Sequence, residues 1–495
     1  MHTQTETLTP PHTAASADSP VVIIGSGPAG LTAAYQLARR GTPCVMVERD
    51  VQVGGLARTV WHNGYGFDIG GHRFFTKMQP VQTIWQDLLG DDFIKVPRLS
   101  RIYYRNRYFN YPLKPVNALL GLGVINSIRI VASYFWRQLR PLPHEEFFEQ
   151  YVINRFGDRL YHIFFKTYTE KVWGIPCTEI RADWAAQRIK GLCLMQAVKS
   201  AFFGESGGKV KSLIEEFDYP RLGPGMLWER MEDHAVAHGA TSIKGREITR
   251  IDHDGHSQIQ RLIHTDAATG TDPQELVGRY YMGTMPLRTL LKRMNPAPPA
   301  EVMQAAESLR YRDFITVNLI LDSTDLFPDN WIYVHAPDVR VGRIQNFRNW
   351  SRHLVPDAGH TGIGMEYFCF EDDDLWSMTD DDLLALAQKE LRHLGLAKSA
   401  NVTDGFVIRV KKAYPMYDEH FASHLAIIRQ WLDRFTNLQQ LGRNGLHKYN
   451  NQDHSMLTAL YGVSNYLDST QHDIWSVNSD SEYQEIQKQP TPARA

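Results

Sequence analysis

The stretch VVIIGSGPAGLTAAYQLARRGTPCVMVERD, residues 21–50, predicts the fold of the first part of the chain. Its first four residues form a β-branched run typical of a short buried strand, and apolar residues at helical spacing follow between positions 31 and 38. A second strand is expected over 44–47, ending at Glu48. The stretch therefore predicts a strand, a glycine turn, a helix and a parallel strand.

The glycine turn has the spacing G-x-G-x-x-G, formed by Gly25, Gly27 and Gly30. In this context the glycines allow a tight turn, close approach of the backbone to a pyrophosphate, and packing of the helix on the strand. The N-terminus of the helix adds N–H donors for the phosphates. Glu48 then lies where a carboxylate accepts hydrogen bonds from an adenosine ribose. We interpret the unit as a Rossmann-type dinucleotide site, the alternative being a glycine turn without a ligand.

A second glycine pair follows in VGGLART, where Gly54 and Gly55 precede Arg58. This extension resembles that of the large FAD family that includes amine oxidases, protoporphyrinogen oxidases and sugar-nucleotide mutases, and the resemblance implies FAD rather than NAD. Arg58 could pair with a phosphate. In the same family the segment matching 68–72 reaches the flavin ring, which implies flavin contacts for Gly71 and His72.

Composition excludes several other classes of protein. The 495 residues include 53 Lys and Arg against 55 Asp and Glu, for a net charge of -2, which gives no reason to expect nucleic acid as a partner. The four cysteines lie far apart without a CxxC pair, so we expect neither disulfides nor a metal site, and a reducing, cytoplasmic setting: Cys44, Cys177, Cys193 and Cys369.

The rest of the chain suggests three structural units between polar tails at 1–20 and 471–495. We expect an FAD-binding Rossmann domain over 21–112, completed by about 214–290 and 436–470, a helical insert over 113–213, and a substrate domain with an antiparallel sheet over 291–435. The expected fold class is therefore α/β with a parallel Rossmann sheet, an antiparallel substrate-binding sheet and a helical insert. No apolar run is long enough to predict a transmembrane segment.

Five segments resemble the UDP-galactopyranose mutase family, most closely its eukaryotic branch. They are GGHRFFTK (70–77), YFNYPLKP (108–115), KVWGIP with ADWAAQRIKG (171–176 and 182–191), WIYVH with VGRIQNF (331–335 and 341–347), and GRNGLHKYNNQDHS (442–455). The resemblance implies that Arg188 and Arg343 bind the diphosphate of a UDP-sugar, and two guanidinium forks suit that dianion. It also implies substrate contacts for Tyr333, Tyr414, Tyr449 and Asn451, and cofactor contacts for Gly442, Arg443 and Asp453.

The activity implied by this resemblance is a redox-neutral isomerisation between pyranose and furanose forms of a nucleotide sugar. Reduced flavin (FADH−) would act as the nucleophile, with NAD(P)H as the reductant, Arg188 and Arg343 holding the substrate, and His72 as a weak candidate for proton transfer. A net oxidoreductase of the amine oxidase and protoporphyrinogen oxidase type is the runner-up, and a non-catalytic flavin-binding protein the third hypothesis. Residues 76–77, 168–170 and 218–225 depart from the mutase pattern, so the sugar and the nucleotide stay open, as does the oligomeric state.

Overall fold

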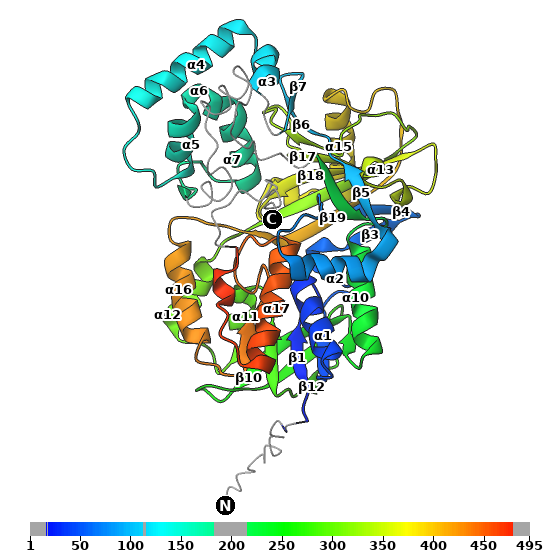
Figure 1. Cartoon of the computed structure of the whole chain (residues 1–495), viewed down its shortest axis with the longest axis vertical. Helices are drawn as coiled ribbons and strands as arrows, with labels where there is room; N and C mark the ends of the chain where they lie inside the picture. The colour runs from blue at the N-terminus through cyan, green and yellow to red at the C-terminus, as the bar shows by residue number, and fades with distance from the viewer. Residues whose placement is uncertain (1–15, 17, 112–114, 183–214, 479–495) are drawn as a thin grey trace, which may run out of the picture.

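The computed structural model describes residues 16, 18–111, 115–182 and 215–478. Figure 1 shows a lobe built around β1 and α1, a second lobe around a large sheet that contains β18 and β19, and a group of helices from α3 to α7 beside that sheet. The fold is mixed α/β, with parallel and antiparallel sheets, as the sequence predicts.

A five-stranded parallel sheet forms the centre of the first lobe. Its order is β20 (Leu438–Gln440), β13 (Tyr280–Gly283), β1 (Val21–Ile24), β2 (Cys44–Val47) and β9 (Thr241–Ile243). All four neighbouring pairs run parallel. Both faces are covered, which explains why β1 is apolar at every position rather than alternating.

The two faces of this sheet meet different partners. Val21 and Ile23 of β1 pack into a core with α1 (Pro28–Arg39), α2 (Gln79–Leu89), α10 (Gly225–Ala237) and α17 (Gln452–Asp468). Val22 and Ile24 face a second core, which contains a four-stranded sheet and three helices: β12 (Gln274–Leu276), β11 (Ile259–Asp266), β10 (Arg246–His253), β14 (Met294–Asn295), α11 (Leu287–Arg293), α12 (Ala300–Ser308) and α16 (Phe421–Leu432).

A seven-stranded sheet forms the second lobe. Its order is β19 (Val402–Pro415), β15 (Tyr311–Leu321), β18 (Thr361–Cys369), β17 (Arg343–Asn346), β16 (Trp331–Val334), β6 (Ser100–Tyr104) and β7 (Arg107–Asn110). The pairs are antiparallel except for β16 with β6, which is parallel. On one face the sheet packs against α14 (Asp374–Ser377) and α15 (Asp380–His393).

The helical segment joins this sheet through α7 (Thr167–Trp173). Lys171 of α7 donates to the carbonyl oxygens of Val334, Ala336 and Val341, at 3.2, 2.9 and 3.1 Å. Burial lowers the pKa of Lys171 to about 8. The other helical elements of the segment are α3 (Pro115–Leu122), α4 (Val124–Leu139), α5 (Phe148–Phe156), α6 (Asp158–Leu160) and the π-helix η3 (Tyr161–Lys166).

Smaller elements connect the lobes. Two ladders pair β3 (Thr59–His62) with β4 (Tyr65–Asp68) and β5 (Phe93–Pro97) with β8 (Glu216–Pro220). Asp68, at the end of β4, is buried and accepts from Tyr219 Oη of β8 at 2.5 Å. The remaining short helices are η1 (Gly55–Ala57), η2 (Gly90–Asp92), α13 (Phe347–Trp350), η4 (Arg352–Leu354) and η5 (Ile474–Ser476).

Two expected domain boundaries differ from the observed packing. Residues 98–112, assigned from sequence to the FAD-binding domain, contain β6 and β7, which are hydrogen-bonded into the seven-stranded sheet. Residues 291–310 and 421–435, assigned to the substrate domain, contain α12 and α16, whose apolar faces pack into the core beneath β1. Both errors have the same cause, because the partner that buries each element is distant in sequence. The expected helical insert extends into 183–213, which lies outside the described residues.

Candidate active site

The first glycine turn has the three features expected of a dinucleotide cradle. Gly25 has a φ of +94°, in the left-handed region. A Cβ on Gly30 would lie 1.9 Å from the carbonyl oxygen of Gly25, so only glycine lets the helix approach the strand this closely. A Cβ on Gly27 would meet nothing within 4 Å. The turn therefore leaves open space directly above the N-terminus of α1, and these residues fit a pyrophosphate there.

Glu48 lies beside this turn at the end of β2. Its carboxylate accepts hydrogen bonds from the backbone N–H of Ser26 at 2.6 Å, from Ser26 Oγ at 3.0 Å and from the N–H of Asp50 at 2.9 Å. These bonds hold an anion at the edge of the glycine turn, which is the place expected for a group that accepts from a ribose hydroxyl.

The second glycine turn packs on the first. The N–H of Gly54 donates to the carbonyl of Ser26 at 2.9 Å, and a Cβ on Gly55 would lie 3.3 Å from Cα of Gly27. Arg58 donates to the carbonyl of Gly55 at 3.1 Å and pairs with Asp50 at 3.2 Å. The structure thus brings both turns together and gives Arg58 a carboxylate partner, whereas the sequence suggested a phosphate.

The loop after β4 lies against side chains of β17 and β18, two interior strands of the large sheet. A Cβ on Gly70 would lie 3.4 Å from Nη2 of Arg343, and one on Gly71 would lie 3.0 Å from Nε2 of Gln345. His72 follows in this loop. Burial, together with the nearby positive charges of Arg343 and Arg443, lowers the pKa of His72 to about 4, so its imidazole is neutral at pH 7.

Arg343, on β17, is held by a carboxylate that sequence reasoning missed. Its Nε and Nη2 donate to the two oxygens of Glu366 at 2.9 and 2.5 Å, and Gln345 Nε2 donates to the same carboxylate at 2.8 Å. Arg343 and Glu366 are direct partners in the β17–β18 register, and Glu366 is fully buried. The Nε–Nη2 fork is therefore turned toward Glu366, which fixes the orientation of the guanidinium. No motif around position 366 signals this role, because it arises from strand pairing.

Tyr414, Tyr449 and Arg443 form a stacked group near His72. The two tyrosine rings lie 5.6 Å apart at 19°, and the guanidinium of Arg443 lies over both, 5.1 Å from the ring centre of Tyr414 and 4.2 Å from that of Tyr449. Arg443 also donates to the carbonyls of Ala413 and Asn450, each at 2.9 Å. Burial, followed by the neighbouring phenol of Tyr449, raises the pKa of Tyr414, so this hydroxyl is a donor at neutral pH.

Tyr333, on β16, belongs to the same region through a second aromatic group. Its ring lies 5.6 Å from that of Tyr168, which stacks on His335 at 4.5 Å and 7°. Burial raises the pKa of Tyr168 well above its ordinary value, and the positive charge of Arg343 opposes this shift. Sequence reasoning named Tyr333 but missed Tyr168 and His335, although Tyr168 is three residues before Lys171 of the KVWGIP segment.

The remaining predicted residues lie around the start of α17. Asn451 is its N-cap and Asp453 lies in its first turn, where it is buried and accepts from the N–H of His454 at 2.9 Å. Gly442 has a φ of +80°, and a Cβ on it would lie 2.9 Å from Ala29 of α1, so this segment adjoins the glycine turn. Arg188 lies outside the described residues.

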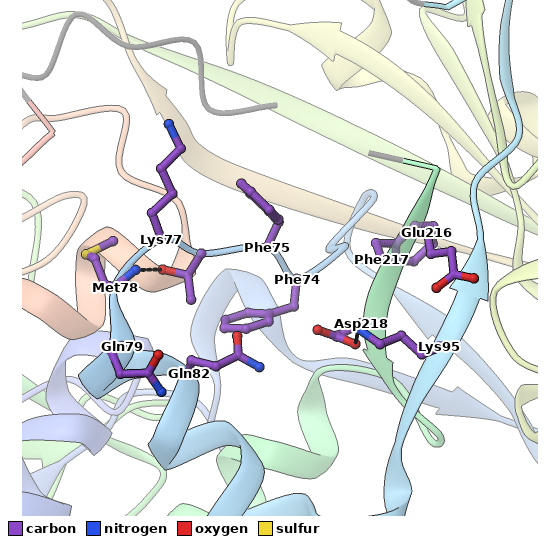
Figure 2. Close-up of a pocket in the computed structure, with 11 residues that line it drawn as sticks. Phe74, Phe75, Lys77, Met78, Gln79, Gln82, Lys95, Glu216, Phe217 and Asp218 are labelled. Carbon is purple, nitrogen blue, oxygen red and sulfur yellow. Dashed lines mark hydrogen bonds and ion pairs between the residues drawn. The ribbon is translucent and has the colours of Figure 1, made fainter. Parts of the chain in front are cut away.

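A cavity of about 300 Å³ borders the loop just beyond His72. Figure 2 shows that it is lined by residues 74–79, Gln82, Lys95 and 216–218, with Lys95 paired to Asp218 at 2.5 Å. In the parts of the chain that the structure describes, no group of three or more His, Cys, Asp or Glu residues could hold a metal ion.

Comparison with known proteins assigns the class of this site. The family described as "Flavin containing amine oxidoreductase" matches residues 28–411, most of the chain, and the protein belongs to this family. It is thus a flavoprotein enzyme of the FAD-dependent amine oxidase superfamily.

Individual relatives match over short segments or at low identity. An "Inactive all-trans-retinol 13,14-reductase" from Danio rerio is 50% identical over 50 residues, 10% of this chain and 8% of that protein. "Protoporphyrinogen oxidase 2, chloroplastic/mitochondrial" from Arabidopsis thaliana is 37% identical over 68 residues, 14% of this chain and 13% of that protein. Each match thus spans a small part of the relative.

Solved structures are similar over nearly the whole chain. A reduced UDP-galactopyranose mutase superposes with a TM-score of 0.80 at 20% identity, covering 94% of this chain and 97% of that one. An oxidoreductase from Methanosarcina mazei gives a TM-score of 0.59 at 12% identity, covering 89% of this chain and 100% of that one. At these identities the similarity establishes the fold.

Proposed function

We propose that the protein is an FAD-dependent isomerase, similar to UDP-galactopyranose mutase, that interconverts pyranose and furanose forms of a nucleotide sugar. The observation that carries the proposal is the convergence of donors at one site. The positive charges of Arg343 and Arg443 both lower the pKa of His72, and both act on the phenol of Tyr414. These groups therefore lie close together, although they come from different elements. Guanidinium and phenol donors together suit a diphosphate and a sugar.

The role of the bound cofactor is to supply, in its reduced form, a nucleophile for the anomeric carbon of the sugar. The residues of this chain bind and orient. The guanidinium of Arg343 binds the diphosphate, while Glu366 fixes the guanidinium in place. Tyr333, Tyr414, Tyr449 and Asn451 donate hydrogen bonds to phosphates and sugar hydroxyls, and Arg188 is the second arginine proposed to bind the diphosphate.

The cofactor contacts follow from the same proposal. The glycine turns 25–30 and 54–55, together with Gly442, hold the pyrophosphate, Glu48 holds the ribose, and Arg58 and Asp453 stabilise the surrounding loops. Gly71, neutral His72 and the cation Arg443 would contact the flavin, where a positive charge would favour the anionic reduced form. We propose NAD(P)H as the reductant and the cytoplasm as the location. The division into an FAD-binding, a helical and a substrate domain is part of the same proposal, with the two boundaries corrected above.

A net FAD-dependent oxidoreductase is the second candidate. It is favoured by the family match over residues 28–411 and by the fold similarity to the oxidoreductase from Methanosarcina mazei. The two candidates differ in electron balance, because an isomerase returns its flavin to the reduced state in every cycle and an oxidase passes two electrons onward.

The test is to reduce the purified protein under anaerobic conditions, incubate it with a panel of UDP-sugars, and analyse the products by NMR. We expect a furanose isomer to form over many turnovers from a single reduction. Glu366→Gln should slow the isomerisation, because Glu366 holds the guanidinium of Arg343 in place. Glu371→Gln is its matched control, since Glu371 forms a surface pair with Lys411. Oxygen uptake that matches product one for one, with no isomer formed, refutes the proposal in favour of the oxidoreductase.

A further inference from the structure

Helix α4 presents an apolar face to solvent. Val124, Ile125, Ile128 and Leu139 have exposures of 76, 69, 64 and 80%. Large apolar side chains are usually exposed singly, so a group of them on one helix indicates a surface that contacts another phase or molecule. The neighbouring Leu120 of α3, 75% exposed, extends the group.

The exposed side chains form one continuous stripe. At about 3.6 residues per turn, seven residues of α4 fall within roughly 120° of its circumference. They are Val124, Ile125, Ile128, Ala132, Phe135, Trp136 and Leu139, all exposed. The opposite side of the helix carries Ile130 and Tyr134, which are buried against the protein. The helix is therefore apolar on its outward face as well as on its inward one.

The charge of this region is strongly one-sided. Residues 93–144 contain no Asp or Glu, in a chain whose net charge is only -2. They contain nine cations: Lys95, Arg98, Arg101, Arg105, Arg107, Lys114, Arg129, Arg137 and Arg140. Three of the nine, Lys95, Arg101 and Arg137, pair with the carboxylates of Asp218, Asp329 and Asp158 from outside this segment. Arg105, Arg107, Arg129 and Arg140 are exposed, and Arg129 lies at the margin of the stripe. Arg140 lies over the ring of Trp136 at 4.6 Å, so a cation and an amphipathic aromatic ring end the stripe together.

We propose that the outward face of α3 and α4 binds the surface of an anionic phospholipid bilayer. An interfacial helix combines an apolar stripe, aromatic residues and flanking Arg or Lys, and it lies in the plane of the membrane with its apolar face among the acyl chains. Each exposed cation adds attraction to anionic headgroups. Figure 1 shows α4 along the outer edge of the molecule, away from β1 and α1, where a flat surface can reach it.

In this proposal α4 lies parallel to the membrane surface and contacts it along its length. Within the described ranges no helix is long and apolar enough to cross a bilayer. At about 1.5 Å per residue, the 16 residues of α4 give a length of roughly 24 Å, enough for four turns of contact. The inference does not depend on the proposed isomerase activity.

A second copy of the chain is the other occupant such a stripe could have. Charge argues against it, because a self-complementary interface along α4 would bring the exposed cations of both copies together without a carboxylate in 93–144 to neutralise them. An anionic headgroup layer neutralises the same cations. The charge pattern therefore favours the bilayer.

The test is co-sedimentation of the 495-residue, FAD-loaded protein with two kinds of vesicle. One kind is phosphatidylcholine alone, and the other contains about 30% phosphatidylglycerol, which makes its surface strongly anionic. We expect binding to the anionic vesicles, little binding to the neutral ones, and a decrease with salt, since the Debye length shortens from about 10 Å at 0.1 M to about 3 Å at 1 M. Tryptophan fluorescence should shift to the blue on binding.

Trp136→Glu is the test variant and Trp61→Glu its matched control. The two tryptophans are 54 and 44% exposed, and Trp61 lies on the β3–β4 hairpin. We expect Trp136→Glu to weaken vesicle binding roughly tenfold or more, and Trp61→Glu to leave it unchanged. FAD content and circular dichroism report the fold of both.

Three results would overturn the proposal. The proposal is refuted directly if the wild-type protein does not co-sediment with anionic vesicles. Equal losses in the two variants would show that the stripe is not the contact. A wild-type dimer by light scattering that becomes monomeric in Trp136→Glu, without vesicle binding, would assign the stripe to a second copy.

Discussion

Gly27→Val separates the cofactor cradle from the fold, because the added side chain meets open space in the protein itself. Gly27 has φ −75° and ψ −174°, which any residue adopts, and no atom lies within 4 Å of the position of its Cβ. Losing glycine at this N-cap costs about 1 kcal/mol, so the free energy of unfolding of the apoprotein should fall by no more than that.

FAD binding should change far more. The valine side chain occupies the space through which a pyrophosphate approaches the N–H groups of α1. Losing two charge-assisted hydrogen bonds of about 1.5–3 kcal/mol each weakens binding by about 3–6 kcal/mol, roughly a hundredfold to ten-thousandfold. The assay is flavin absorbance after gel filtration, with urea unfolding of the apoprotein as the measure of the fold.

Gly30→Ala is the contrasting variant, since its Cβ would lie 1.9 Å from the carbonyl oxygen of Gly25. It should lower the stability of the apoprotein itself, whereas Gly27→Val should not. Full FAD occupancy in a well-folded Gly27→Val protein would show that the pyrophosphate does not pass over this turn, and the cradle assignment would fail.

Three further variants address the site and the fold. Arg343→Ala should weaken UDP binding ten- to a hundredfold by calorimetry, a loss of about 1.5–3 kcal/mol. It should also destabilise the protein by about 3–5 kcal/mol, because it leaves the buried carboxylate of Glu366 without its cation. Adding Glu366→Gln should restore stability but not affinity, and unchanged UDP affinity in both variants would contradict the diphosphate site. Burial raises the pKa of Asp68 to about 7, so this group stabilises the folded state fully below about pH 4 and loses that contribution as the pH rises through 7. In urea titrations, the destabilisation caused by Asp68→Asn should therefore be about 2–3 kcal/mol greater at pH 5 than at pH 8. An equal destabilisation at both pH values would refute the raised pKa. Lys171→Met should lower the free energy of unfolding by about 2–4 kcal/mol, because it removes three hydrogen bonds to carbonyl oxygens. The control Lys166→Met, which removes only an exposed pair with Glu170, should lower it by less than about 1 kcal/mol. Similar losses in the two variants would show that the three carbonyl contacts contribute little.

The sequence predicts features that depend on local spacing. The glycine turn, β1 and β2 are found where they are expected, because turn chemistry and short β-branched runs act over a few residues.

Features that depend on pairing between distant strands could not be predicted in this way. Glu366 belongs to the site only because β17 and β18 place it opposite Arg343, and the assignment of β6 and β7 depends on the pairing of β6 with β16. His335 is positioned through its stacking on Tyr168 from the helical segment. In each case the decisive neighbour is more than twenty residues away, beyond the range of any periodicity.

The order of strands in the parallel sheet bears on how the protein is made. β1 and β2 are synthesised before the other strands of this sheet, yet β1 pairs with β13 at 280–283, and β20 at 438–440 completes the sheet. Helix α17, which packs on α1, is the last long helix in the described part of the chain. The glycine turn is thus synthesised before the strands and the helix that pack around it. We expect cofactor loading to wait for β20 and α17, and a nascent polypeptide stalled before residue 438 to carry no flavin.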